Sequence, residues 1–103
     1  MAKSAANDLE NYLRDQVQQL GGDTRKWVSP MRVGVPDQIV ILTGKIVFAE
    51  IKTFNDDLKS WQEREHRRLR ALGATVTVLW EYKGVDMFII DLTLASAINH
   101  EYK

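Results

Sequence analysis

The 103-residue sequence contains no cysteine, which excludes disulfide bonds and thiolate metal sites. This absence is typical of proteins from a reducing cytosol. The sequence also lacks an apolar run near the roughly 18 residues of a membrane span, and residues 1–4 do not open a signal peptide. We therefore expect a soluble, cytoplasmic protein with no membrane partner.

An excess of either charge is absent as well. Fourteen Lys and Arg residues balance fourteen Asp and Glu residues, so the formal net charge is zero. A purely electrostatic nucleic-acid binder would be basic, and the composition argues against that class. No linker, repeat or low-complexity segment interrupts the chain. Its length suits one domain, residues 1–103, with a single apolar core.

Hydrophobic periodicity predicts a mixed α/β domain with a sheet between helices. We expect a helix over residues 4–20, ended by Gly21-Gly22, and a short strand over residues 26–29. A strand pair up to residue 52 precedes a second helix that reaches Leu72 and is closed by Gly73. Residues 75–80 and 85–90 are predicted strands, and residues 92–101 a last helix. The apolar stripe of the first helix is Leu9, Leu13, Val17 and Leu20. The expected cap of the second helix is Asn55, Asp56 or Asp57.

The strand pair carries the main candidate site. If Thr43 and Gly44 form its turn, Asp37 lies opposite Glu50, and Lys52 follows on the same strand face. Directly opposed carboxylates repel each other, and a cation is the usual reason to keep them together. The pattern favours a metal site, although Pro-Asp and Glu-x-Lys are individually common. The apolar residues on the face of the carboxylates are Ile39, Ile41, Ile46 and Phe48, and those on the other face are Val40, Leu42, Val47, Ala49 and Ile51.

Two helices add polar candidates. Glu10 borders the apolar stripe of the first helix, where it either reaches toward the metal or is an ordinary solvated residue. In the second helix, Gln62 and Glu65 interrupt the apolar positions, with His66 alongside. This interruption indicates either a polar site or one solvated turn. No His-x-x-x-His spacing is present, so we do not expect zinc. The apolar positions that they interrupt are Leu58, Trp61, Leu69 and Leu72.

Positive charge gathers in the second helix and before Pro36-Asp37. Such a run is usually a solvated helix face, but beside a metal site it favours phosphate contacts. The basic residues are Lys59, Arg64, Arg67, Arg68 and Arg70 in the helical region, and Arg14, Arg25, Lys26 and Arg32 before the loop.

Taken together, these motifs resemble the PD-(D/E)XK nuclease superfamily and, more closely, the stand-alone phage form of the VRR-NUC domain. The similarity extends to about Trp80. Gln38 and Lys59 depart from the family, where Arg and Ser are common. The residues that carry the resemblance are Glu10, Gly21-Gly22, Lys26, Gly34-Val35-Pro36-Asp37, Phe48-Ala49-Glu50-Ile51-Lys52, Gln62 and Leu72-Gly73.

The resemblance implies a restriction-endonuclease-like core and a metal-dependent DNA endonuclease without an organic cofactor. Asp37, Glu50 and the Ile51 carbonyl would hold Mg²⁺ or Mn²⁺, with Glu10 in support. Lys52 would orient the attacking water or help to deprotonate it, and Gln62 would orient Lys52 or the water. Residues that would contact DNA are Lys26, Arg25, Arg32, Lys59 and Arg67.

Two paired cuts in a four-way junction require a symmetric dimer, so our first hypothesis is a homodimeric Holliday-junction resolvase. One alternative is a monomeric flap or nicking nuclease. Another is a non-catalytic interaction protein in which the carboxylates form only an ion-paired cluster with Lys52. A candidate dimer surface comprises Trp80, Tyr82, Met87 and Phe88.

Overall fold

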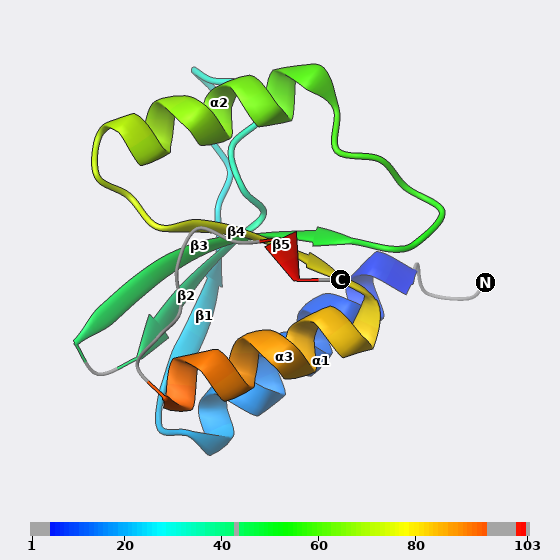
Figure 1. Cartoon of the computed structure of the whole chain (residues 1–103), viewed down its shortest axis with the longest axis vertical. Helices are drawn as coiled ribbons and strands as arrows, with labels where there is room; N and C mark the ends of the chain where they lie inside the picture. The colour runs from blue at the N-terminus through cyan, green and yellow to red at the C-terminus, as the bar shows by residue number, and fades with distance from the viewer. Residues whose placement is uncertain (1–4, 43, 95–100, 103) are drawn as a thin grey trace.

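A computed structural model describes residues 5–42, 44–94 and 101–102 of the chain. Helix and strand alternate after an initial helix and three strands (Figure 1). The elements are α1 (Ala5–Gln19), β1 (Asp23–Lys26), β2 (Gln38–Leu42), β3 (Lys45–Lys52), α2 (Ser60–Ala71), β4 (Val76–Trp80), α3 (Glu81–Thr93) and β5 (Glu101–Tyr102).

The strands form a mixed sheet in the order β1-β2-β3-β4-β5. The first three pair antiparallel, whereas β3, β4 and β5 run parallel and are joined by α2 and α3. Helices α1 and α3 lie side by side on one face of the sheet, and α2 lies over the other (Figure 1). The predicted class, a mixed sheet flanked by helices, is therefore confirmed.

The register of the β2–β3 hairpin is the predicted one. Leu42 pairs with Lys45 and Gln38 pairs with Ala49, so one further step places Asp37 opposite Glu50. Gly44 has a φ of +76°, which glycine adopts without strain. The apolar side chains of the carboxylate face are not covered at the turn end, where Ile41 and Ile46 are exposed.

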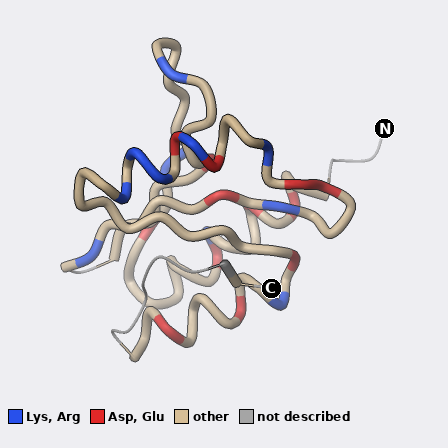
Figure 2. The backbone as a smooth tube through the Cα atoms, turned by 45° about the horizontal axis from the view of Figure 1, so that its top comes forward, with Lys and Arg blue, Asp and Glu red and all other residues tan. Residues whose placement is uncertain are grey.

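Helix α2 covers the sheet with polar side chains. Its buried residues are Glu65 and His66, whereas Trp61 is half-exposed and Leu72 is exposed. The apolar stripe predicted for this helix is therefore wrong at those two positions. Basic residues recur along α2 (Figure 2), as the sequence indicated.

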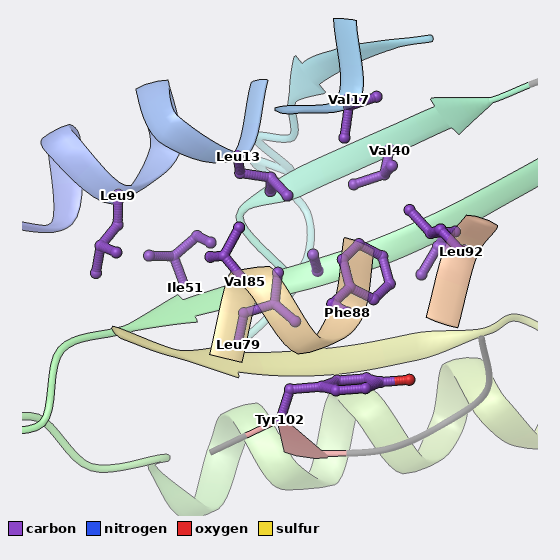
Figure 3. Packing of buried hydrophobic residues seen from close by; sticks show 12 residues of the cluster. Leu9, Leu13, Val17, Val40, Ile51, Leu79, Val85, Phe88, Leu92 and Tyr102 are labelled. Carbon is purple, nitrogen blue, oxygen red and sulfur yellow. The ribbon is translucent and has the colours of Figure 1, made fainter. Parts of the chain in front are cut away.

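The apolar core lies between the sheet and the α1–α3 pair (Figure 3). The stripe of α1 is buried as predicted, except for Leu20, which is partly exposed. Helix α3 contributes side chains at a helical spacing, and Tyr102 closes the core edge-on against Phe88 at a ring distance of 5.5 Å. The core residues are Leu9, Leu13, Val17, Val40, Val47, Ala49, Ile51, Leu79, Val85, Phe88, Leu92 and Tyr102.

Several predicted boundaries are wrong. The strand expected over residues 26–29 is β1, which ends at Lys26. The second helix begins after Lys59 instead of after the expected cap, Asn55, Asp56 or Asp57. Its predicted end holds, because Gly73 has a φ of +99°.

The C-terminal prediction is also wrong. Residues 85–90 lie inside α3, not in a strand, and the helix ends at Thr93. Of the last helix predicted over residues 92–101, residues 95–100 lie outside the described residues, and Glu101 belongs to β5. None of the described helices is both long enough and apolar enough to cross a membrane.

Candidate active site

Asp37 and Glu50 come together at the end of the hairpin near β4. Asp37 directly precedes β2, and its Oδ2 accepts a 3.0 Å hydrogen bond from the Ile51 backbone amide of β3. Glu50 is only 2% exposed, because α2 covers its face of the strand. The structure thus brings together the two carboxylates that the register predicted.

Glu50 is held by α2. Its Oε2 accepts a 3.1 Å hydrogen bond from the Gln62 amide nitrogen, and His66 Nε2 lies 3.6 Å from its Oε1. That Oε1 is buried and has no hydrogen-bond partner among the described residues. A buried carboxylate oxygen without a partner is costly, which makes this atom a candidate ligand.

Lys52 lies two residues beyond Glu50 on the same face of β3, and it is only 4% exposed. Its Nζ donates to Gln62 Oε1 at 3.0 Å and to Asp56 Oδ2 at 3.3 Å, and it lies 3.8 Å from Glu50 Oε2. Gln62 Oε1 also accepts the Lys59 backbone amide at the start of α2. Gln62 therefore connects the strand residues to the first turn of the helix.

Burial shifts the pKa values of Glu50 and His66 so that the neutral form of each side chain is favoured. Burial first, and the nearby Asp37 second, raise the pKa of Glu50 to about 9. Burial first, and then the positive charges of Arg70 and Lys52, lower the pKa of His66 to about 4. At neutral pH the carboxylate pair therefore retains a proton, which a cation could replace.

The donors fit a hard divalent cation. Asp37 and Glu50 offer carboxylate oxygens beside the backbone of Ile51, and the partnerless Oε1 of Glu50 lacks a donor or cation. In the described part of the chain, no three His, Cys, Asp or Glu side chains are grouped to hold a metal. The site therefore supplies two carboxylates, and other ligands would be backbone, water or substrate oxygens.

Glu10 and Lys26 form a pair of their own. Lys26 Nζ lies 3.4 Å from Glu10 Oε1, which links α1 to β1. Glu10 therefore does not join a three-carboxylate group in this structure. Arg25, beside it, donates to Asp23 at 2.5 Å and is exposed.

The other predicted DNA contacts lie around α2. Lys59 Nζ is 3.7 Å from Asp56, and Arg32 in the β1–β2 loop is 3.9 Å from Glu65. Arg67 is exposed on α2. These side chains and Arg64 lie on the α2 side of the sheet, the side that carries Glu50.

Asp56 is the residue that the sequence did not assign to the site. The sequence predicted only a possible helix cap, whereas its carboxylate holds Lys52 and Lys59. The signal that could have identified it is its position four residues after Lys52, in the segment leading to the second helix. Phe88, by contrast, is completely buried and is excluded from the predicted dimer surface, whereas Tyr82 and Met87 are exposed.

Comparisons with known proteins agree with this geometry. No model of a protein family matches the sequence. The phage protein named "Putative nuclease p44", from Acyrthosiphon pisum secondary endosymbiont phage 1, is 46% identical over 74 residues. These residues are 71% of this chain and 80% of that protein.

Two solved structures share the fold. A VRR_NUC domain has a TM-score of 0.78 and 34% identity, covering 85% of this chain and 97% of that domain. Hjc of Archaeoglobus fulgidus, a Holliday junction resolvase, has a TM-score of 0.57 and 17% identity, covering 76% of this chain and 65% of that protein. The second likeness shows a common fold. From the first and from the phage relative, the chain belongs to the VRR_NUC family of nucleases.

Proposed function

We propose that this chain is a metal-dependent endonuclease that hydrolyses phosphodiester bonds in branched DNA. One observation carries the proposal: Asp37, Glu50, Lys52 and Gln62 meet in one hydrogen-bonded cluster on one face of the sheet. Structural ion pairs rarely leave a buried carboxylate oxygen without a partner, as at Glu50. The nuclease relatives support the same reaction class.

The chain would hold Mg²⁺ or Mn²⁺ with Asp37, Glu50 and the Ile51 carbonyl. Glu10, which pairs with Lys26, would support the ion through water. When bound, the ion would polarise the scissile phosphate, stabilise the charge of the in-line transition state and lower the pKa of water. Lys52, fixed by Gln62 and Asp56, would orient the attacking water and donate a hydrogen bond to a phosphate oxygen. Gln62 would hold the side chains of Lys52 and Glu50 in fixed relative positions.

For the substrate, we propose a four-way junction. The likeness to Hjc, a Holliday junction resolvase, supports this choice. A single site cuts one strand, so paired cuts would need a homodimer with two symmetry-related sites. The basic residues Lys26, Arg25, Arg32, Lys59 and Arg67 would contact the phosphates.

The test uses labelled four-way junction, flap and plain duplex, each with Mg²⁺, Mn²⁺ or EDTA. We expect paired, metal-dependent nicking of the junction, and its loss in Lys52→Ala. Lys83→Ala, an exposed lysine of α3 on the other side of the sheet, is the matched control and should cut normally. Light scattering should give the mass of a dimer.

Other results would identify the alternatives. Cleavage of flaps by a monomer would keep the chemistry and contradict the junction substrate. If no DNA is cut and Mn²⁺ does not raise the melting temperature, the cluster is structural and the nuclease proposal is wrong.

A further inference from the structure

A nine-residue loop leaves the sheet at the candidate site and returns to it. Its ends are joined by a 2.9 Å hydrogen bond from the Trp27 amide to the carbonyl of Asp37, and residues 28–36 lie between them. The loop passes beside α2 and projects beyond it (Figures 1 and 2). Its position is therefore tied directly to a candidate metal ligand.

The loop is also packed on α2. Gly34 has a φ of +88°, and a Cβ added there would lie 2.6 Å from the Trp61 carbonyl oxygen and 3.0 Å from the Gln62 Cα. Only glycine allows such a close approach. The loop thus rests on the helical turn whose Gln62 side chain holds Lys52 and Glu50.

The tip of the loop exposes apolar side chains. Val28 and Val33 are each 74% exposed and Met31 is 89% exposed. Met31 and Val33 also line one hollow, and apolar side chains gathered on a surface mark binding sites. Beside them is a hollow of about 380 Å³, lined by Met31, Arg32, Val33, Trp61, Arg64 and Arg68.

The surroundings of the tip suit a nucleic acid. Apolar side chains such as methionine insert between base steps, an aromatic ring stacks on a base, and arginines bind the flanking phosphates. The hollow offers all three groups, with Trp61 half-exposed. Arg64 and Arg67, nearby on α2, are exposed and have no ion-pair partner among the described residues.

We propose that Met31 and Val33 form a wedge that enters an unstacked base step at the branch point of DNA. The wedge would fix the distance between the branch point and the phosphate that meets Asp37 and Glu50. This inference rests on the proposed function, and it adds how a single small domain would distinguish branched DNA from plain duplex. Branch points are the natural target because their bases are already partly unstacked.

The test measures binding and unstacking without cleavage. Purified full chain is titrated, with Ca²⁺ as the only divalent cation, into a four-way junction carrying 2-aminopurine at the branch point. We expect a fluorescence rise with the wild type. The double variant Met31→Ser/Val33→Ser should lose that rise and bind the junction about 10-fold more weakly. Its binding to plain duplex should stay the same, since phosphate contacts remain.

Leu94→Ser is the matched control, because it removes an exposed apolar side chain from the end of α3. It should behave as the wild type. Equal melting temperatures would show that the double variant is folded. An unchanged fluorescence rise in the double variant, or no rise in the wild type, would overturn the wedge. A shift of the double variant from dimer to monomer would also overturn it, by showing that the tip binds a second copy.

Cleavage is assayed separately in Mg²⁺ and Mn²⁺. Unstacking without cleavage would support the wedge and contradict the proposed hydrolysis. Junction cleavage by the double variant with wild-type rate and position would contradict the wedge and keep the proposed function.

Discussion

The ammonium group of Lys52 donates a 3.0 Å hydrogen bond to the side-chain oxygen of Gln62, and this contact joins β3 to the first turn of α2. The amide nitrogen of the same Gln62 donates to Glu50 at 3.1 Å. One side chain therefore sets the spacing between a candidate ligand and a candidate catalytic lysine. The site belongs to a strand and a helix together.

Gln62→Ala should lower the rate of DNA cleavage about 100-fold, because Lys52 would lose its 3.0 Å acceptor and keep, among the described residues, the longer hydrogen bond to Asp56. We expect kcat to fall and KM to stay nearly constant, as measured by single-turnover and steady-state cleavage. Gln18→Ala is the matched control, since Gln18 of α1 donates a hydrogen bond to the half-exposed Asp23 of β1. Equal effects of the two variants would contradict a positioning role for Gln62.

Stability of the metal-free protein should fall as pH rises from 7 to 9. The folded state raises the pKa of Glu50 from 4.5 to about 9, so the folded protein keeps a proton that the unfolded chain has released. The stability from this group is complete below about pH 4.5 and is lost as pH rises through 9. His66 acts in the opposite direction only between about pH 4 and 6.5, below this window. Chemical denaturation in EDTA measures the slope.

Mg²⁺ or Mn²⁺ should counter this loss by taking the place of the proton, so the stabilisation by metal should be larger at pH 8 than at pH 5. Glu50→Gln should remove both the slope and the response to metal. Glu63→Gln, an exposed change in the helix α2 that covers Glu50, should keep both the pH slope and the response to metal. A metal response that persists in Glu50→Gln would show that the ion binds elsewhere.

Gly34→Ala should reduce cleavage far more than its loss of stability explains. Gly21→Ala is an unusually close control, because Gly21 has a φ of +89° against +88° for Gly34 and has no atom within 4 Å of an added Cβ. Both variants should lose about 1 kcal/mol from backbone strain. Only Gly34→Ala should push the loop from the Trp61 carbonyl and disturb Gln62. Thermal unfolding and junction cleavage of both variants make the comparison.

Removing two arginines of α2 should weaken DNA binding without changing its dependence on sequence. For Arg64→Gln/Arg67→Gln, the slope of log affinity against log salt should become shallower by about two. Lys83→Gln, an exposed change on α3 across the sheet, should leave the slope unchanged. Fluorescence anisotropy from 50 to 300 mM salt, roughly the range where counterion release dominates, measures both. A slope unchanged in the double variant would place the phosphate contacts elsewhere.

The hairpin shows why part of the site could be read from the sequence. Side chains alternate along a strand, so a two-residue turn between the strands would place Asp37 and Glu50 on one face, and the observed pairing has that register. Lys52 follows by the same period of two. Both patterns depend only on residues close together in the chain, so they hold once the two strands pair in one sheet.

The region of α3 shows where such reading failed. Residues 85–90 are rich in Val, Ile and Phe, which favours a strand on propensity alone. The buried positions Val85, Phe88 and Leu92 instead follow a helical period, set by packing against α1 and the sheet. Tertiary contacts of α3 with α1 and the sheet therefore outweighed the local strand propensity.

The sequence by itself determined the α1 stripe and the alternation of side chains along each strand, since each depends on a fixed repeat along the chain. With a two-residue turn, that alternation also predicted that Asp37 lies opposite Glu50. Only the tertiary structure decided that α2 turns Gln62, Glu65 and His66 inward, and that Asp56 holds Lys52. It also decided that Gly34 seats the exposed loop on α2. These contacts join segments whose meeting depends on how the helix lies over the sheet, and no repeat along the chain specifies that placement.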